Sequence, residues 1–264
     1  MLSVVTSSTV AKPPTLGVQG MLRLGVVLPS VNTVVESWFN RVLPECASLH
    51  TSRMMLTNPV TKETLKQMDH EEGLPSALRL ASCRPHVIAY GCTASSIVQG
   101  PAYDQHLKKT FQEATGIPCF TAVHAIEEAL RQLGAHTICL ASPYTAAIDH
   151  AEKAYFESLG FQVAGTANLG ISDGFELASP SANDIFNLAL RAWKADADAL
   201  LISCLNMNSH VVVQRLEREL GCPVVTSTTA TLWMLLRTAG IPVHMSGYGR
   251  LLDRDIPKFE TTIT

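Results

Sequence analysis

The chain has 264 residues, of which 47% are hydrophobic and 16% charged, and its formal net charge at pH 7 is -3. This composition excludes a disordered, collagen-like or coiled-coil protein, because those classes are far richer in charge or in a simple repeat. The 20 basic residues are balanced by 23 acidic ones and form no cluster. We therefore expect no nucleic-acid partner, since a phosphate backbone requires a positive surface.

The ends of the chain and its cysteines indicate where the protein resides. Residues 1–20 are rich in Ser, Thr and Pro and contain no acid, which predicts a disordered extension, with an organelle-targeting leader as the alternative. Residues 253–264 are expected to form a tail. The seven cysteines are an odd number without paired spacing, which indicates reduced thiols and a cytoplasmic location. No apolar run approaches the roughly 20 residues that span a bilayer, so we expect no membrane segment.

From residue 22 onward, short apolar segments alternate with longer amphipathic ones. The short segments are bounded by Gly, Pro or Ser and predict strands at residues 24–28, 87–90, 137–141, 199–203 and 223–225. Apolar residues at helical spacing predict helices at residues 123–133, 146–159, 182–194, 210–220 and 231–239. Such alternation is typical of an α/β fold, in which a parallel sheet is covered by helices on both faces.

The two halves of the chain repeat one another. Three pairs of similar positions lie 114, 112 and 105 residues apart: Pro29 and Pro143, Cys92 and Cys204, Pro118 and Pro223. We infer a duplicated α/β unit of about 110 residues, which is the size of a small domain and not of a solenoid repeat. The first half is predicted to comprise residues 21–122 together with 228–252, and the second half residues 123–227.

Two cysteines occupy matching positions in the repeats. Cys92 and Cys204 each follow a predicted strand, and ligands of parallel α/β proteins bind at the carboxyl ends of the strands. If the halves face one another, the two thiols lie on opposite sides of one cleft. The N–H groups of a following helix are predicted to lower the thiol pKa and to bind a carboxylate. The alternative is that these thiols only pack in the core, which is what we expect of Cys46, Cys83, Cys119, Cys139 and Cys222.

Four segments together resemble the aspartate/glutamate racemase superfamily, and within it the branch of the maleate cis-trans isomerases and arylmalonate decarboxylases. They are residues 29–33 (PSVNT), 90–95 (YGCTAS), 203–207 (SCLNM) and 231–240 (TLWMLLRTAG). The resemblance extends from about residue 22 to residue 252. It implies two pseudo-symmetric Rossmann-like halves, each a mainly parallel sheet flanked by helices, with a cofactor-free active site in the cleft between them. It also implies a homo-oligomer, with a dimer as the simplest form.

The resemblance assigns roles to residues of this chain. Cys92 corresponds to the nucleophile or base of the isomerases, and Cys204 to the second, proton-donating cysteine. Asn32 and Tyr144 correspond to substrate-binding residues. Backbone and side-chain groups that follow the two cysteines complete the predicted substrate contacts: Thr93, Ala94, Leu205 and Asn206. From the residues alone, Asn32 and Thr93 are also ordinary helix caps, and Tyr144 is also a residue that packs at a strand end.

Two positions depart from the isomerase pattern. The isomerases carry a substrate-binding Asn where this chain aligns Gly174, and commonly Thr where it has Leu205. The arylmalonate decarboxylases keep only the second cysteine, so the presence of Cys92 argues against their activity. The expected function is therefore a maleate cis-trans isomerase-like reaction on a small mono- or dicarboxylic acid. A racemase, an arylmalonate-type decarboxylase and a non-catalytic cytosolic small-acid-binding protein remain the alternatives.

Cofactor and metal motifs are missing from the sequence. The nine histidines show no H-E-x-x-H spacing, no cysteine pair has C-x-x-C spacing, and neither a P-loop nor a G-x-G-x-x-G turn follows a predicted strand. We expect no metal and no nucleotide cofactor. The polar residues 226–229 (TSTT) are interpreted as the N-cap of the next helix.

Overall fold

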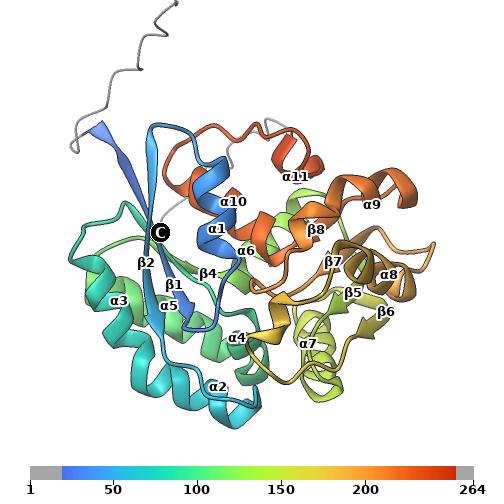
Figure 1. Ribbon diagram of the computed structural model, residues 1–264, viewed down its shortest axis with the longest axis horizontal. Helices are drawn as coiled ribbons and strands as arrows, with labels where there is room; N and C mark the ends of the chain where they lie inside the picture. The colour runs from blue at the N-terminus through green and yellow to red at the C-terminus, as the bar shows by residue number, and fades with distance from the viewer. Residues whose placement is uncertain (1–19, 254–264) are drawn as a thin grey trace, which may run out of the picture.

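A computed structural model describes residues 20–253 of the chain. These residues form two four-stranded sheets in which every pairing is parallel (Figure 1). The first sheet has the order β2-β1-β3-β4 and the second the order β6-β5-β7-β8. The second order repeats the first with each strand number raised by four, which confirms the duplicated α/β unit. The predicted extension at residues 1–20 and the predicted tail lie almost wholly outside the described residues.

The strands and helices alternate along the chain as the sequence predicts. The first sheet contains β1 (Leu22–Pro29), β2 (Ala47–Met54), β3 (Val87–Tyr90) and β4 (Cys119–Thr121), and the second β5 (Thr137–Ser142), β6 (Gln162–Asn168), β7 (Ala199–Ile202) and β8 (Val224–Thr226). The helices are α1 (Val35–Val42), α2 (Lys62–Met68), α3 (Leu74–Ala81), α4 (Thr93–Gln99), α5 (Pro101–Thr115), α6 (Ala122–Gln132), α7 (Ala146–Ser158), α8 (Ala182–Ala192), α9 (Val213–Leu220), α10 (Ser227–Thr238) and α11 (Arg250–Asp253).

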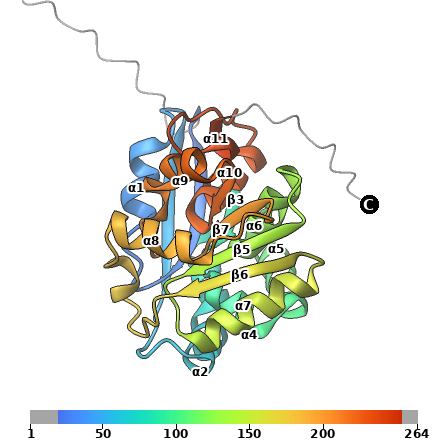
Figure 2. The same cartoon turned by 90° about the vertical axis from the view of Figure 1, so that its right-hand side faces the viewer.

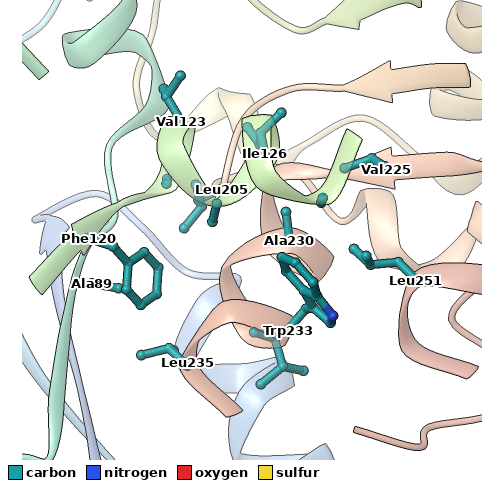
Figure 3. Close-up of a cluster of buried hydrophobic side chains, with 14 of the residues drawn as sticks. Ala89, Phe120, Val123, Ile126, Leu205, Val225, Ala230, Trp233, Leu235 and Leu251 are labelled. Atoms are coloured by element: carbon teal, nitrogen blue, oxygen red, sulfur yellow. The ribbon is translucent and has the colours of Figure 1, made fainter. Parts of the chain in front are cut away.

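A hydrophobic core joins the two halves. Helices α6 and α10 follow the last strand of each sheet and pack on one another, and α10 also contacts β3 and β8. Phe120, Ile126 and Trp233 are buried in this region together with Leu205 (Figure 3). Each such side chain contributes roughly 1.5–3 kcal/mol through removal of apolar surface from water, so this core fixes the orientation of the halves. The exact bounds of the halves stay a prediction.

The register of the central strands brings the two cysteines to the same edge of the molecule. In the first sheet Val27 of β1 pairs with Tyr90 of β3, and in the second Ala141 of β5 pairs with Ile202 of β7. Strands paired in this way end at the same level. The turns that follow them therefore meet at the carboxyl edge, where Cys92 and Cys204 lie.

The structure corrects several predicted elements. The outer strands β2 and β6 and the helices α1 to α5 were not predicted from the sequence. Helix α10 begins at Ser227, four residues earlier than predicted, because Thr226 caps it: the Thr226 side chain accepts a hydrogen bond from the Thr229 N–H. The predicted helix at residues 210–220 is a short 3-10 turn followed by α9. Within residues 20–253, none of the helices is both long and apolar enough to cross a membrane.

Candidate active site

A small pocket lies where the carboxyl ends of the two sheets meet. All eight site residues predicted from the sequence line it: Asn32, Cys92, Thr93, Ala94, Tyr144, Cys204, Leu205 and Asn206. The rest of the lining was not predicted. It consists of apolar side chains and one glycine: Pro29, Val31, Leu56, Val60, Leu65, Gly91 and Leu177. The structure thus brings both cysteines to one small cavity.

Cys92 is held at the junction between β3 and α4. It is the N-cap residue of α4 and is 6% exposed. The preceding Gly91 packs so closely on β1 that a Cβ atom there would lie 2.7 Å from the Leu28 side chain and 3.0 Å from the Val27 carbonyl oxygen. Only glycine fits this close approach, and this contact places the Cys92 thiol at the pocket.

Cys204 occupies a strained position after β7. It has a positive φ of 94°, a conformation that costs a non-glycine residue about 1–3 kcal/mol. Its N–H donates to the Ser227 hydroxyl at 2.9 Å, and that hydroxyl also accepts a hydrogen bond from Thr93 at 3.2 Å. The Asn206 N–H donates to the Cys204 sulfur at 3.3 Å. Ser227, which the sequence analysis did not identify as a site residue, therefore connects the turns that carry the two cysteines.

The predicted lowering of the thiol pKa is wrong for the protein without ligand. Burial raises the pKa of Cys92 far above its ordinary value, and the nearby Asp69 raises it further. Burial likewise raises the pKa of Cys204 to about 12, although the Tyr144 hydroxyl and the Asn206 N–H favour its thiolate. The loss of water around each sulfur outweighs the helix N–H groups, so both thiols are protonated at neutral pH.

A buried carboxylate lies behind Cys92. Asp69 begins a π-helical turn, Asp69–Gly73, and π turns are frequent at functional sites. Its carboxylate accepts hydrogen bonds from four side chains: Tyr90, Ser95 at 2.5 Å, Tyr103 at 2.8 Å and Gln99 at 2.9 Å. The Tyr90 hydroxyl is also within hydrogen-bonding reach of the Cys92 sulfur. Nothing in the sequence singles out Asp69, because it belongs to a polar segment that resembles an ordinary surface helix.

Replacement of Asp69 by Asn is expected to make Cys92 more reactive. Removal of the negative charge lowers the pKa of Cys92, and a decrease of 0.5–1 unit raises the thiolate fraction about threefold to tenfold. The measurement is the rate at which iodoacetamide alkylates the peptide that contains Cys92. Cys204 serves as the internal control, since Asp69 is not among the groups that shift its pKa. An unchanged or lower Cys92 rate would show that Asp69 does not control this thiol.

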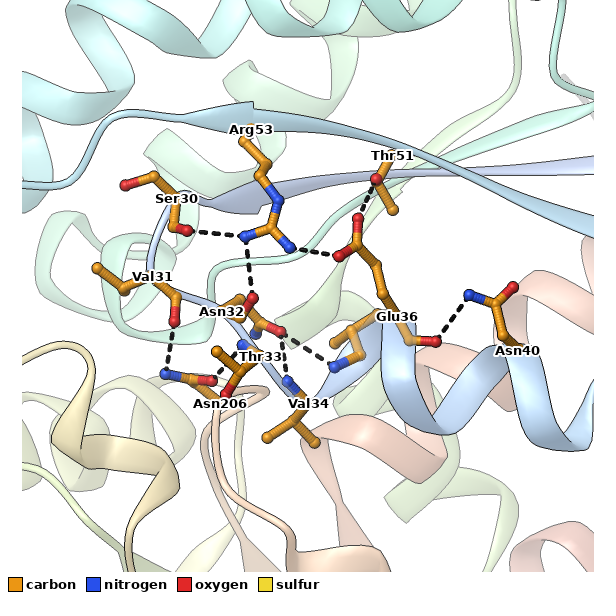
Figure 4. A network of polar contacts seen from close by, with 11 residues as sticks. Ser30, Val31, Asn32, Thr33, Val34, Glu36, Asn40, Thr51, Arg53 and Asn206 are labelled. Atoms are coloured by element: carbon orange, nitrogen blue, oxygen red, sulfur yellow. Dashed lines mark hydrogen bonds and ion pairs between the residues drawn. The ribbon is translucent and has the colours of Figure 1, made fainter.

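Asn32 is fixed by a network at the turn after β1 (Figure 4). Its side-chain Oδ1 accepts hydrogen bonds from the N–H groups of Val34 and Val35, at 3.1 and 3.0 Å. Arg53 donates to the Asn32 carbonyl at 2.9 Å and forms an ion pair with Glu36. Asn32 therefore satisfies backbone N–H groups at the start of α1, which is a common role of Asn. With Oδ1 fixed in this way, its Nδ2 group has no hydrogen-bond partner within residues 20–253 and remains available at the pocket.

Asn206 and Leu205 lie at the pocket, but their side chains serve the structure. The Asn206 amide accepts a hydrogen bond from the Thr33 N–H at 2.9 Å and donates to the carbonyl oxygens of Val31 and Gly174, at 3.3 and 2.9 Å. The Leu205 side chain belongs to the core between the halves (Figure 3). Both residues therefore offer the pocket their backbone more than their side chains. Leu205, which replaces the Thr common in the isomerases, consequently changes the core and not the polarity of the pocket.

Gly174 completes the apolar wall. A Cβ atom at Gly174 would lie 3.1 Å from the Val31 side chain and 3.3 Å from that of Val60, both of which line the pocket. Its N–H donates to the Asn58 side chain at 2.8 Å. Because no polar side chain extends from position 174, this side of the pocket is bounded by aliphatic groups. Within residues 20–253, no group of three or more His, Cys, Asp or Glu residues is placed to hold a metal ion.

Comparison with known proteins agrees with this arrangement. Residues 25–252 match the arylmalonate decarboxylase family. The chain belongs to this family. Within the family it is similar to the maleate isomerase of Nocardia farcinica, with 31% identity across 89% of this chain and 97% of that protein. It is also similar to the arylmalonate decarboxylase of Bordetella bronchiseptica, with 32% identity across 69% of this chain and 78% of that protein.

The family member with the most informative structure is a variant of the Nocardia farcinica maleate cis-trans isomerase that carries a covalently bound succinylcysteine intermediate. Its structure matches this one with a TM-score of 0.83 and 30% identity, covering 88% of this chain and 98% of that chain. This chain is accordingly a maleate isomerase-like, cysteine-based member of the arylmalonate decarboxylase family.

Proposed function

We propose that the protein isomerises the double bond of a small cis-unsaturated carboxylic acid, with Cys92 as nucleophile and Cys204 as proton donor. The observation that carries this proposal is that two buried cysteines, one from each repeat, line the same small pocket. A single packed cysteine is common, but two thiols at matching strand ends around one cavity suit chemistry on both faces of a planar substrate.

The reaction starts when the thiol pair has lost one proton, with Cys92 as thiolate. The Cys92 sulfur bonds to one alkene carbon, the electrons of the double bond move to the neighbouring carbon, and that carbon takes the proton of Cys204. The carbon–carbon bond is now single and rotates. Cys204, as thiolate, then removes the proton, the double bond re-forms in the trans geometry, and the Cys92 sulfur leaves with its electron pair. Cys92 must lose its proton before the reaction starts, and its pKa is raised. Activity is therefore expected to rise with pH.

Substrate carboxylates are held by neutral donors in this proposal. Asn32, Tyr144, Thr93 and Leu205 line the cavity from both halves, and the proposed donors are the Asn32 Nδ2 group, the Tyr144 hydroxyl and the backbone N–H groups of Thr93 and Leu205. Such fixed dipoles stabilise a negative charge without reorganisation during the reaction. Among the described residues no Lys or Arg lines the pocket, so in this proposal the charge of the acid is balanced by hydrogen bonds alone.

The apolar wall supports a second candidate function. Leu56, Val60 and Leu177 line the cavity, and an aliphatic surface favours an apolar substituent over a second carboxylate. This observation and the family match favour decarboxylation of a substituted malonic acid as the alternative. That reaction requires a proton donor at Cys204 and leaves Cys92 without a role. Isomerisation is preferred because it uses both thiols.

The test is proton NMR of the purified protein with maleate in heavy water. The isomerase proposal predicts the appearance of fumarate without added cofactor, and its loss in the Cys92→Ala variant. If neither maleate nor alkyl-substituted maleates are converted to their trans isomers, and carbon dioxide is released from a substituted malonate, the decarboxylase is supported instead.

A cytoplasmic location and a dimeric assembly are part of the same proposal. All seven cysteines are free thiols, which supports a reducing compartment. The dimer rests on the family resemblance, and its measurement is the mass of the protein in solution by light scattering.

A further inference from the structure

The most unusual buried acid in the protein is Glu152, in the middle of α7. Its exposed fraction is 0%, and neither carboxyl oxygen has a hydrogen-bond partner among the described residues. Asp69 behind Cys92, in contrast, receives four hydrogen bonds. Burial of an ionised carboxylate without partners costs much more than burial of the neutral acid. The geometry therefore favours an uncharged Glu152 in the folded protein.

The position of Glu152 connects it to Cys204. The hydroxyl of Ser203, the residue immediately before Cys204, is also buried without a partner in the described part of the chain, and it is close enough to the Glu152 carboxyl to act on its pKa. The carboxyl is also close enough to act electrostatically on the Cys204 sulfur and on the Tyr144 hydroxyl. Glu152 thus lies behind the pocket on the side of Cys204.

Few other titratable groups surround this carboxyl. Helix α7 packs against β6 and α4 (Figure 2). Strand β6 carries no titratable side chain, and α4 has only Cys92, at its N-cap. On α7 itself, Asp149 is the acid that acts on Glu152. Lys153, the cation next to it on α7, pairs with Glu157 instead, and within residues 20–253 no salt bridge stabilises an ionised Glu152.

We propose that Glu152 is a positioning residue that works as an uncharged acid and, together with Ser203, keeps Cys204 acidic enough to donate its proton. While it is neutral, the carboxyl and the adjacent Ser203 hydroxyl place no charge beside the strained turn at Cys204. When it loses its proton, a negative charge appears beside the Cys204 sulfur and makes that thiol a weaker acid. The inference rests on the proposed function only in naming Cys204 as the proton donor.

The titration of Glu152 falls in a measurable range. Burial raises the pKa of Glu152 to about 8. Glu152 is therefore neutral below this pH and charged above it. Two measurements test the role of Glu152 without a substrate. Their outcome is therefore independent of the test of isomerisation.

The first measurement is the alkylation rate of Cys204 by iodoacetamide, resolved by peptide mass spectrometry, in the wild-type protein and in Glu152→Gln. Gln resembles the neutral acid in shape and carries no charge. At pH 9.5 or so the variant is expected to react about threefold to tenfold faster, because a pKa that is 0.5–1 unit lower raises the thiolate fraction by that factor. At a pH near 6.5 the two rates should converge.

Two controls separate a charge effect from general loosening of the site. Glu157→Gln changes an exposed acid on the same helix, paired with Lys153 at 3.8 Å, and should leave the Cys204 rate unchanged at every pH. Cys83, a half-buried thiol that does not line the pocket, is the internal control. Ser203→Ala should also alter the Cys204 rate. A rate ratio between Glu152→Gln and wild type that stays constant with pH would overturn the proposal.

The second measurement is the melting temperature as a function of pH. The folded pKa of Glu152 is raised above its ordinary value of 4.5, so the protein takes up a proton on folding between these two values and loses stability as the pH rises. The melting temperature of Glu152→Gln minus that of wild type should therefore increase from a pH near 4.5 to a pH near 8 and level off above it. A difference that does not change with pH would show that Glu152 is not a buried neutral acid.

Discussion

Replacement of either Cys92 or Cys204 by alanine is expected to lower kcat by about a thousandfold or more while the fold stays intact. Each thiol has a role that the other cannot fill, because one forms the bond to carbon and the other transfers the proton. Residues that act as a unit lose most of the rate when either is removed. The measurement is turnover of the acid identified by NMR, together with circular dichroism of each variant.

Cys83→Ala is the matched control for these variants. Cys83 is half-buried, its thiol donates to the Leu80 carbonyl, and it does not line the pocket. It should retain nearly full activity. Substantial activity in Cys92→Ala alone would contradict the two-thiol mechanism and point to a reaction that needs only Cys204, such as decarboxylation.

The second large effect is expected for Asn206→Ala. The Asn206 side chain joins the turn after β1 to the segment around Gly174, through three hydrogen bonds to backbone groups. Its removal leaves the part-buried Thr33 N–H and two carbonyl oxygens without their partner, and the expected loss of unfolding free energy is about 2–4 kcal/mol. Because this link positions two walls of the pocket, kcat is also expected to fall at least about tenfold.

Urea unfolding and turnover measure these two losses. The matched control is Asn208→Ala in the same segment, whose side chain makes only one long hydrogen bond, to the Ala178 carbonyl at 3.4 Å. That variant should lose less than about 1 kcal/mol. Equal stability of the two variants would show that the Asn206 link does not hold the pocket together.

The repeat in the sequence predicts the architecture because the inner strands are fully buried. β3 and β7 are short, continuous apolar segments, which is the pattern of a strand covered on both faces. The outer strands β2 and β6 are only partly buried; β2 contains polar and charged residues, and β6 contains polar ones. Their pattern is that of a sheet edge, and it cannot be distinguished from a loop without knowledge of the neighbouring strand.

The candidate site shows the same division between what the sequence determines and what packing determines. Both cysteines are predictable, because strand ends mark the ligand edge of a parallel sheet. The direction in which the pKa of each thiol is shifted cannot be predicted from the sequence. It depends on desolvation by atoms from both halves that surround each sulfur. Asp69 and Glu152 are missed for a related reason. Each lies in a helical segment that contains other acids at solvent-exposed positions, and only the folded structure shows which acid points inward.

The most direct test of the central claim is to trap the bond between Cys92 and substrate. Serine at position 204 is a poor proton acceptor, so Cys204→Ser should slow the return step and allow the adduct to accumulate. Intact-mass and peptide mass spectrometry of this variant after incubation with maleate should show one added substrate molecule, located on Cys92. An unmodified protein, or an adduct that persists when Cys92 is also replaced by alanine, would contradict the assignment of Cys92 as the nucleophile.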